Sequence, residues 1–394
     1  MNKKQKKTLL IITNERLSDF VHKGHIIKRY YNPGDLFDVV HFLVLKDEIP
    51  VEPEEVRPLF GTAEFHIHSY DIINIRHFLL TFFWRPFLIN ITLRPLIKKI
   101  RQLKPDLIRC QLAYNLPLYV GVKIKEKLGV PCCISLHGNA DVDNRNAPNL
   151  PLKHKIYHYS AQTIERYALQ RADMVMPVYS SIFPYLERME CKNYELYYNV
   201  INPGQICIKK DYTLGKQIKI LCVNRQVTEK NPKNLILAIQ KLPNIKLTLI
   251  GEGALQQQLK QLVRHLKIDN RVEFINNMPN TELLKLYPKY DIFANHCQYF
   301  GIGKTIIEAA LSGLPIITNF REGEQIDEYK NADWLMLVKN TPEGYMNAIN
   351  KLVNDGHFRE QLGVRARKHS SAIWLPEITE QRYVDLYKKL VPGL

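Results

Sequence analysis

Short apolar runs alternate with helical patterns along most of this 394-residue chain, and this alternation is the strongest constraint on its fold. A short apolar run fits a buried strand, and a helix that crosses back over the sheet places the next strand parallel to the one before. The pattern therefore predicts α/β units built on parallel sheets. In the first half we expect strands at Thr8–Thr13, Asp38–Val44, Leu107–Cys110, Pro131–Leu136, Met174–Pro177 and Glu195–Tyr198, and helices that include Tyr119–Leu128 and His154–Arg171.

A break in the alternation divides the chain into two such units. Asn199–Gly204 is followed by a polar stretch, and the pattern restarts at Ile218. We therefore expect one domain over residues 1–203 and a second over 204–375, both doubly wound, with a ligand in the cleft at the carboxyl ends of their strands. In the second domain we expect strands at Ile218–Val223, Lys246–Ile250, Val272–Ile275, Ile292–Asn295, Leu314–Thr318 and Trp334–Val338, and helices at Lys233–Lys241, Leu255–Leu266, Thr281–Tyr287 and Glu343–Asp355.

The last helical pattern lies beyond the second domain. Pro376–Leu390 follows a break at Trp374–Pro376 and carries an apolar stripe formed by Ile378, Tyr383, Leu386 and Tyr387. A helix that follows such a turn can cross back over the chain. We therefore assign residues 376–394 to the first domain.

The composition fits a soluble globular protein in a reducing compartment. Apolar residues make up 45% of the chain and charged residues 24%, which are ordinary values for such proteins. The seven cysteines contain no C-x-x-C pair, which predicts neither a zinc site nor a disulfide framework. Cys132 and Cys133 are expected to be buried strand thiols. The run Leu9–Ile12 is too short for a signal peptide, and no run reaches the ~20 apolar residues of a membrane span. We therefore expect a cytoplasmic protein.

The formal net charge of +16 predicts an anionic partner. From Ile73 to Lys104 the chain has seven Arg or Lys residues and no Asp or Glu, mixed with aromatic and aliphatic residues. This mixture fits either an amphipathic helix with a solvated basic face or a segment that touches an anionic membrane surface. No zinc finger, RNA-binding or helix-turn-helix motif accompanies it, so we do not expect nucleic acid as a partner.

The glycine-rich segment Gly301–Thr318 is a candidate ligand site. It reads as a glycine turn, a short helix that carries Glu308, a second glycine turn and a buried strand. Gly303 precedes the helix, whose free N–H groups and dipole favour an anion. A phosphate-binding turn beside a carboxylate that can bind a sugar hydroxyl indicates a nucleotide-sugar site. The letters Gly-Lys-Thr from Gly303 do not form a P-loop, because that motif needs a glycine where Gln298 stands.

A second candidate site follows the predicted strand Ile218–Val223. Asn224–Asn231 holds Arg225 and Lys230, two cations that can neutralise a leaving group as its bond breaks; the alternative is two exposed cations on a loop. With the segments that follow it, this stretch resembles the retaining GT-B glycosyltransferases of family 4 (glycosyl transferases group 1), which show Gly-Arg-x4-Lys-Gly here. Both flanking glycines are replaced in this chain. The resemblance implies two Rossmann-like domains facing a cleft, a C-terminal helix returning to the first, and a donor diphosphate gripped by Arg225 and Lys230.

The same resemblance assigns roles around Glu308. Glu308 stands where the family's second glutamate binds the donor ribose; the alternative is a solvated helix residue. Phe300 stands where the first glutamate contacts the sugar, so the usual sugar contacts must differ here. Ile275 ends a strand whose following loop reads the nucleotide base. Gly303 would offer backbone donors to the phosphates, and Lys304 is either a phosphate contact or a surface residue at the helix start.

Three first-domain residues are also candidates. Ile134–Asp141 resembles the family strand that ends in His-Gly-x-Asp, with one extra residue between His137 and Asp141. The resemblance implies that His137 faces the transferred sugar and that Asp141 lies in the same pocket; a structural histidine at a strand end is the alternative. Gly24, in the loop after the first strand, would let the backbone approach the donor.

The expected function is transfer of a sugar from a nucleoside diphosphate sugar to a glycan or glycolipid, with retention, in bacterial envelope polysaccharide synthesis. The enzyme would be a hexosyltransferase or a related transferase, which needs neither a metal nor another cofactor, with possible contact to the inner face of the membrane. Phe300 and the replaced glycines leave a second hypothesis open, a non-catalytic glycosyltransferase-like protein that binds nucleotide as a scaffold. A sugar-nucleotide epimerase would need a different acid/base set, which we do not find.

Overall fold

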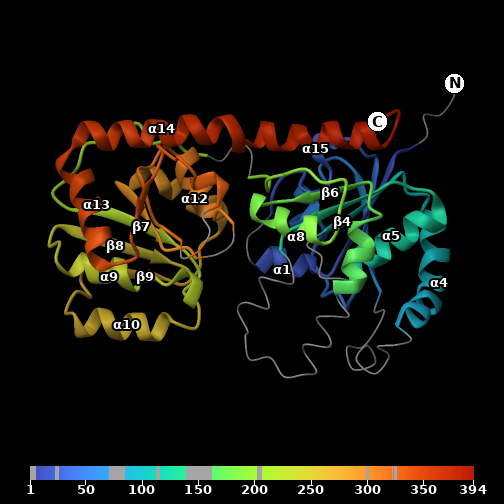
Figure 1. Cartoon of the computed structure of the whole chain (residues 1–394), viewed down its shortest axis with the longest axis horizontal. Coiled ribbons are helices and arrows are strands. Elements are labelled where there is room, and N and C mark those ends of the chain that lie inside the picture. The colour runs from blue at the N-terminus through green and yellow to red at the C-terminus, as the bar shows by residue number, and fades with distance from the viewer. Residues whose placement is uncertain are drawn as a thin grey trace. The chain divides into compact units, whose positions relative to one another are not determined.

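The computed structural model describes residues 6–22, 26–70, 85–111, 116–138, 162–201, 206–298, 301–321, 323 and 326–394, with the backbone alone for 85–90 and 92. The chain divides into two compact units (Figure 1). The first unit is Met1–Val200 with Thr379–Leu394, and the second unit is Ile201–Ile378. Each unit contains a six-stranded parallel sheet with its own buried core. The predicted two-domain α/β architecture is therefore confirmed.

The first unit is built on a sheet with the strand order β3-β2-β1-β4-β5-β6. Its central strand β1 is buried along its whole length, as expected for a parallel strand covered on both faces. In register, Leu9 of β1 lies opposite Val40 of β2 on one side and Leu107 of β4 on the other. The strands are β1 (Thr8–Thr13), β2 (Val39–Val44), β3 (Glu64–Ser69), β4 (Leu107–Gln111), β5 (Cys132–Leu136) and β6 (Met174–Pro177).

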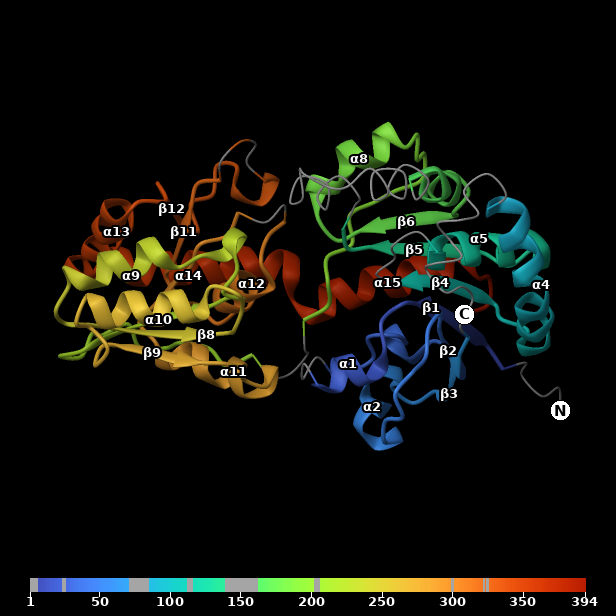
Figure 2. The same cartoon turned by 90° about the horizontal axis from the view of Figure 1, so that it is seen from below.

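Helices cover both faces of this sheet (Figure 2). One core brings together apolar residues of α1, α2 and the C-terminal helix α15 under the face that carries Leu9 and Phe42. On the opposite face, Leu96 and Ile100 of α4 line a small cavity with Leu10. The helices are α1 (Leu17–His22), α2 (Pro53–Phe60), α4 (Arg85–Leu103), α5 (Leu116–Leu128), α8 (Phe183–Arg188) and α15 (Pro376–Leu390).

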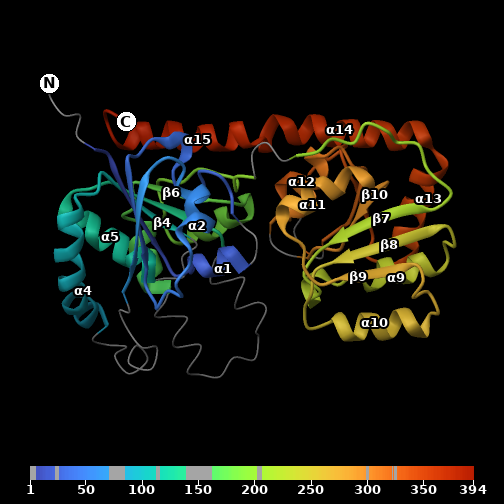
Figure 3. The ribbon, with the colours of Figure 1, turned by 180° about the vertical axis from the view of Figure 1, so that it is seen from behind.

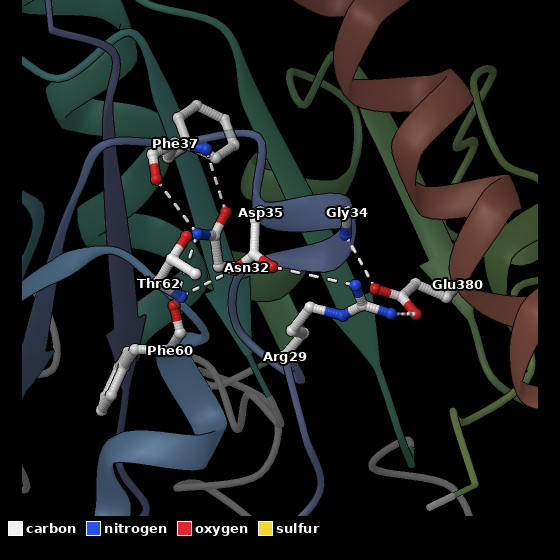
Figure 4. A network of polar contacts seen from close by, with 8 residues as sticks. All are labelled: Arg29, Asn32, Gly34, Asp35, Phe37, Phe60, Thr62 and Glu380. Carbon is white, nitrogen blue, oxygen red and sulfur yellow. Dashed lines mark hydrogen bonds and ion pairs between the residues drawn. The ribbon is translucent and has the colours of Figure 1, made fainter. Parts of the chain in front are cut away.

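The C-terminal helix α15 is an integral part of the first unit. Tyr383 and Tyr387 are buried in its core. Figure 4 shows the polar part of the same contact, in which Glu380 pairs with Arg29 at 2.8 Å and accepts a hydrogen bond from the Gly34 amide at 2.7 Å. Gly34 has a φ of +64°, and an added Cβ there would lie 2.7 Å from a methyl of Val384. The prediction that the last helix returns to the first domain is confirmed.

The second unit repeats the same plan with the strand order β12-β11-β10-β7-β8-β9 (Figure 3). Residues of α9, α10 and α13 pack on one side of β7 and β8 in a second core. The strands are β7 (Ile218–Val223), β8 (Ile245–Ile250), β9 (Val272–Ile275), β10 (Ile292–Ala294), β11 (Ile316–Asn319) and β12 (Met336–Val338). The helices are α9 (Lys233–Gln240), α10 (Gln256–His265), α11 (Asn280–Leu286), α12 (Lys304–Leu311), α13 (Pro342–Asn354) and α14 (Gly356–Trp374).

One expected strand is wrong, and two elements of the structure were not predicted. Glu195–Tyr198 is not a strand, because only Tyr194 forms an isolated bridge, with Val175 of β6. The edge strand β3 was not predicted, since its polar and histidine-rich sequence lacks the apolar run of a buried strand. The helix α14 was also not predicted. Cys132 and Cys133 are buried strand thiols in β5, as expected.

The basic segment of the first unit forms an amphipathic helix over its described part. Leu93, Leu96 and Ile100 of α4 are buried, whereas Arg94 and Lys98 are exposed. This arrangement agrees with a core-facing helix that has a solvated basic face; residues 71–84 lie outside the described structure. Within the ranges that are described, no helix combines the length and the apolar character needed to cross a bilayer.

Candidate functional site

The predicted donor residues of the second unit cluster where parallel strands end. Arg225 follows β7 directly, and the start of α12 is tied to the same strand end, because the Thr305 hydroxyl donates to the Val223 carbonyl at 3.0 Å. The carboxyl ends of parallel strands are where α/β folds bind ligands. The fold therefore brings the Arg225 loop and the Gly303 turn to one edge of the sheet.

Two glycines allow the loops after β7 and β8 to lie backbone against backbone. A Cβ on Gly251 would stand 2.2 Å from the Asn224 carbonyl oxygen, and one on Gly253 would stand 2.4 Å from that of Gln226. The Gln226 amide donates to the Glu252 carbonyl at 2.9 Å, so the loops are also hydrogen-bonded. These glycines therefore have an architectural role, since they fix the loop that carries the cations.

Arg225 and Lys230 form a pair of neighbouring cations. Arg225 is exposed, whereas Lys230 is partly buried at the end of a short 3-10 helix, Thr228–Lys230. Burial lowers the pKa of the Lys230 ammonium, and the nearby Arg225 guanidinium lowers it further. The two positive charges repel each other in this partly buried loop, and a bound anion would reduce that repulsion. This geometry suits a diphosphate better than it suits two independent surface charges.

Cys297 and Gln298, which follow β10, are held by hydrogen bonds to other segments of the second unit. Cys297 donates its amide to the Asn319 side chain at 2.7 Å, and Gln298 donates its amide to the Glu229 carbonyl at 2.7 Å. The Asn319 amide group donates to the Gln298 side chain at 3.1 Å, and Arg321 donates to the Gln298 carbonyl at 3.2 Å. Gln298 thus connects the Lys230 loop to the end of β11.

Glu308 is buried, with a fractional exposure of 1%. One carboxylate oxygen accepts a hydrogen bond from the Asn280 side chain at 2.9 Å, and the other accepts one from the Tyr287 hydroxyl at 3.0 Å. Burial, followed by the Glu308 charge, raises the pKa of Tyr287, so this phenol stays protonated and donates. The alternative that Glu308 is a solvated helix residue is therefore wrong.

Lys304 and Gly303 form the start of α12. The Lys304 ammonium lies 3.6 Å from Glu308 and is partly exposed. Gly303 is the N-cap, without a side-chain cap, and its carbonyl accepts from the Ile306 amide at 2.9 Å. A Cβ on Gly303 would meet only ordinary contacts of 3.8 Å or more. The helix start therefore places a cation beside Glu308, and the role of Lys304 toward phosphate stays a prediction.

Ile275 ends β9, as expected. Its carbonyl accepts a hydrogen bond from the Gly251 amide at 2.8 Å, so this carbonyl already has a partner within the sheet. A carbonyl oxygen can accept a second hydrogen bond, so this contact does not decide whether Ile275 or the loop after it reads the nucleotide base. That role stays a prediction.

In the first unit, His137 follows β5 and is partly buried. Its Nε2 lies 3.2 Å from the Gln111 amide nitrogen and 3.1 Å from the Ser135 hydroxyl. Burial, followed by the Arg109 charge, lowers the pKa of His137 to about 3. The imidazole is therefore uncharged near neutral pH. Three further candidates, Gly24, Asp141 and Phe300, lie outside the described residues.

The sequence did not point to the residues that support these candidates. Asn280 and Tyr287 hold Glu308, and Asn319 holds Gln298. Arg109 did leave a signal, a charged residue inside an otherwise apolar strand. Among the residues the structure describes, no group of three or more His, Cys, Asp or Glu side chains is arranged to hold a metal ion.

Comparison with solved structures defines the class of this fold. Sucrose-phosphate synthase from Thermosynechococcus elongatus matches with a TM-score of 0.70 over 98% of this chain and 99% of that chain, at 17% identity. HepE from Anabaena, solved in complex with UDP, matches with a TM-score of 0.70 over 97% of this chain and 100% of that chain, at 14% identity. Two Rossmann-like units with these neighbours define a GT-B fold.

Two family models match the sequence along most of its length. Glycosyltransferase Family 4 matches residues 39–204, and Glycosyl transferases group 1 matches residues 207–369. The chain belongs to the group 1 glycosyltransferases.

A relative in Rhizobium meliloti, the lipopolysaccharide core biosynthesis glycosyltransferase LpsE, is 26% identical over 167 residues, which are 42% of this chain and 48% of that protein. The chain thus spans about half the length of this relative.

Proposed function

We propose that this protein transfers a sugar from a nucleoside diphosphate sugar to a hydroxyl of a glycan or glycolipid. The observation that carries the proposal is the pair of cations Arg225 and Lys230, of which Lys230 is partly buried with a lowered pKa. This pair lies at the same sheet edge as the start of α12. A diphosphate leaving group would reduce the repulsion between the two cations, and the UDP complex of HepE makes a nucleoside diphosphate the natural candidate.

The second unit would hold the leaving group. Arg225 and Lys230 neutralise the diphosphate as the bond to the sugar breaks, and preorganised charge of this kind provides much of the rate enhancement of many enzymes. Lys304 and the backbone at Gly303 would contact the same phosphates. Glu308 would accept hydrogen bonds from the ribose, since a carboxylate has acceptor positions beyond the two that Asn280 and Tyr287 fill.

The first unit would hold the sugar. His137 would line the sugar pocket as a neutral imidazole, with Asp141 near the sugar and Gly24 near the donor, as the resemblance implies. The resemblance also implies that Phe300, from the second unit, lies near the sugar. We propose retention of configuration, with the departing phosphate taking the acceptor proton, so that no protein nucleophile is required. No metal or other cofactor is required by this scheme, because Arg225 and Lys230 supply the positive charge.

The acceptor is proposed to be an envelope glycan or glycolipid. Support comes from LpsE, whose name refers to lipopolysaccharide core biosynthesis. The exposed cations of α4, which include Arg94, Lys98 and Lys99, would let the protein approach the anionic inner face of a membrane from the cytoplasm. Co-sedimentation with anionic and with neutral vesicles tests this contact, and equal recovery in both supernatants would remove it.

A thermal-shift screen against UDP, GDP, ADP and CMP and their sugars tests the donor site. The best ligand should stabilise the parent, and Arg225→Ala and Lys230→Ala should each lose most of the shift. Arg264→Ala removes an exposed cation of α10 and is the matched control, which should shift like the parent. Equal shifts in all four proteins would contradict the donor site.

Turnover separates the transferase from the scaffold alternative. Long incubations of the preferred nucleotide sugar, with and without acceptor glycans, should release the nucleoside diphosphate. Tight nucleotide binding without any release across the donor panel would favour the non-catalytic scaffold.

A further inference from the structure

Arg109 is a buried cation without a carboxylate partner in the described structure. It lies in the middle of β4 with a fractional exposure of 1%, and no acidic side chain among the described residues comes within ion-pair distance of it. Burying a charge without a counter-ion is costly, so other groups must compensate for it. Such a residue in a strand core calls for a functional explanation.

Aromatic faces and a carbonyl replace the missing carboxylate. The guanidinium carbon lies 5.0 Å from the ring centre of Tyr383 and 5.5 Å from that of Tyr30, within the range of cation–π contacts. One guanidinium nitrogen donates to the Tyr30 carbonyl at 3.1 Å. Burial alone would lower the pKa of Arg109, but Tyr387, Tyr383 and Tyr30 raise it, so the guanidinium stays charged.

Tyr30 and Tyr383 are also connected to His137, each through one further polar side chain. Gln111, two residues after Arg109 and so on the same face of the sheet, donates to the Tyr30 hydroxyl at 2.8 Å and lies 3.2 Å from His137 Nε2. Tyr383 has a side-chain hydrogen bond with Ser135, whose hydroxyl lies 3.1 Å from the same Nε2. Within the described residues both of these imidazole contacts use Nε2.

We propose that Arg109 is a positioning residue for His137: its buried guanidinium holds Tyr30 and Tyr383, which fix the imidazole through Gln111 and Ser135 in the same layer of side chains. The proposal rests on the proposed function, in which His137 lines the sugar pocket. As the bond to the diphosphate breaks, positive charge develops on the sugar. An imidazolium would repel that charge, whereas a neutral imidazole can still exchange a hydrogen bond with a sugar hydroxyl.

The groups that surround His137 agree with this role. Arg109 is the cation that lowers its pKa, after burial. Burial raises the pKa of Tyr30 and Tyr31 most; Glu15 also raises both, and Glu48 raises that of Tyr31. The titratable or polar side chains of this layer come from β4 (Arg109, Gln111), β5 (Cys133, Ser135), the loop before β2 (Tyr30, Tyr31) and α15 (Tyr383, Tyr387).

Titration of His137 by NMR tests the proposal without any substrate. The protein has 13 histidines, so a ¹⁵N-histidine-labelled sample is compared with His137→Gln to identify the resonance. In the parent, His137 should stay neutral down to about pH 5. Arg109→Met should raise its pKa by about one unit or more, and Arg109→Lys, which keeps a cation, should restore most of the difference.

Arg29→Met is the matched control. Arg29 also contacts α15, through Glu380, so this variant loosens the helix without removing the charge beside His137. The pKa of His137 in this variant should equal its pKa in the parent. If the pKa of His137 rises equally in Arg29→Met and Arg109→Met, loosening of α15 rather than the lost charge causes the rise. That result would overturn the proposal.

The parent alone can also overturn the proposal, even if Arg109→Met does not fold. A His137 that titrates above pH 6 in the parent would contradict a histidine held neutral by Arg109. If transferase activity is found, Arg109→Met should add an acidic limb to the pH profile of kcat/KM that Arg109→Lys lacks. If the parent shows no turnover while His137 titrates as expected, the result counts against the proposed function and leaves the role of Arg109 standing.

Discussion

At the scale of single residues, the candidate donor site depends on contacts that leave no room for substitution. Gly251 has a φ of +125°, a conformation that side chains rarely adopt, and its missing Cβ lets the Asn224 carbonyl approach. The loop that carries Arg225 and Lys230 is therefore positioned by a residue that does not itself touch a ligand.

Gly251→Ala should destabilise the protein by about 2–4 kcal/mol, because it adds both a clash at 2.2 Å and backbone strain. Gly215→Ala is the control, since Gly215 has no positive φ and its nearest neighbour would lie 3.9 Å away. That variant should change the free energy of unfolding by less than about 0.5 kcal/mol. Urea unfolding of both variants measures the difference, and similar losses would contradict the assignment.

The chemistry of the site residues could be predicted from the sequence, whereas their surroundings could not. The spacing of Arg225 and Lys230 after an apolar strand pointed to a cation pair, and the structure places both at one strand end. The burial of Glu308 depends on Asn280 and Tyr287, which come from a helix far away in sequence. A one-dimensional pattern carries no information about such partners.

At the scale of elements, burial decided which strands were predictable. β1, β6, β7 and β9 have the predicted bounds. β1 and β7 lie inside their sheets and read as apolar runs, as parallel strands covered on both faces do. β6 and β9 are edge strands that still have apolar residues at most positions. β3 lies at the sheet edge, where alternating exposure removes that signal. α14 escaped prediction because its buried residues include Arg359, Gly363 and Ser370, which interrupt an apolar stripe.

The edge strand β3 also brings histidines together. His66 of β3 stacks on His41 of β2 with ring centres 5.0 Å apart, and His68 Nε2 lies 3.1 Å from His41 Nδ1. Burial, followed by the neighbouring His68 and His66, lowers the pKa of His41 to about 4. Burial, followed by Lys99 of α4, lowers the pKa of His68. This corner of the sheet therefore resists protonation.

The stability of the first unit should fall as the pH drops from about 6.5 to about 4. In that window the unfolded chain binds protons that the folded His41 refuses, so protonation favours unfolding. His41→Phe keeps a ring on β2 and should reduce this dependence, whereas His137, whose pKa is lowered to about 3 in the same unit, should maintain the rest. His265→Phe, at the exposed end of α10, is the control and should keep it. Urea unfolding at pH 7.5 and pH 5 measures both, and an unchanged slope in His41→Phe would contradict the prediction.

At the scale of the whole molecule, two sheets with separate cores predict two unfolding units. The chain has three tryptophans, of which Trp334 and Trp374 are buried in the second unit. In a Trp84→Phe variant, tryptophan fluorescence therefore reports the second unit alone, whereas circular dichroism reports both. The donor residues of the proposed site belong to the unit that fluorescence follows.

A nucleoside diphosphate at ~100 times its Kd should stabilise the fluorescence-detected transition by about 2.7 kcal/mol. The part of the circular dichroism change that comes from the first unit should keep its denaturant midpoint. The reason is that the ligand would bind mainly through Arg225, Lys230 and Glu308, which belong to the second unit. Denaturant titrations of the Trp84→Phe variant with and without nucleotide measure this. If fluorescence and circular dichroism show one transition whose midpoint shifts equally with nucleotide, the two units do not unfold independently.

The C-terminal helix has a consequence for how the protein is made. α15 supplies Tyr383 and Tyr387 to the core of the first unit, yet it leaves the ribosome only after the entire second unit has been synthesised. Domains usually fold as they emerge, the N-terminal one first. Here the earlier domain must wait for the later one to be translated before Arg109 acquires its neighbours Tyr383 and Tyr387. A chain that stops after α14 would contain nearly all of the second unit, whereas its first unit would still lack part of its core.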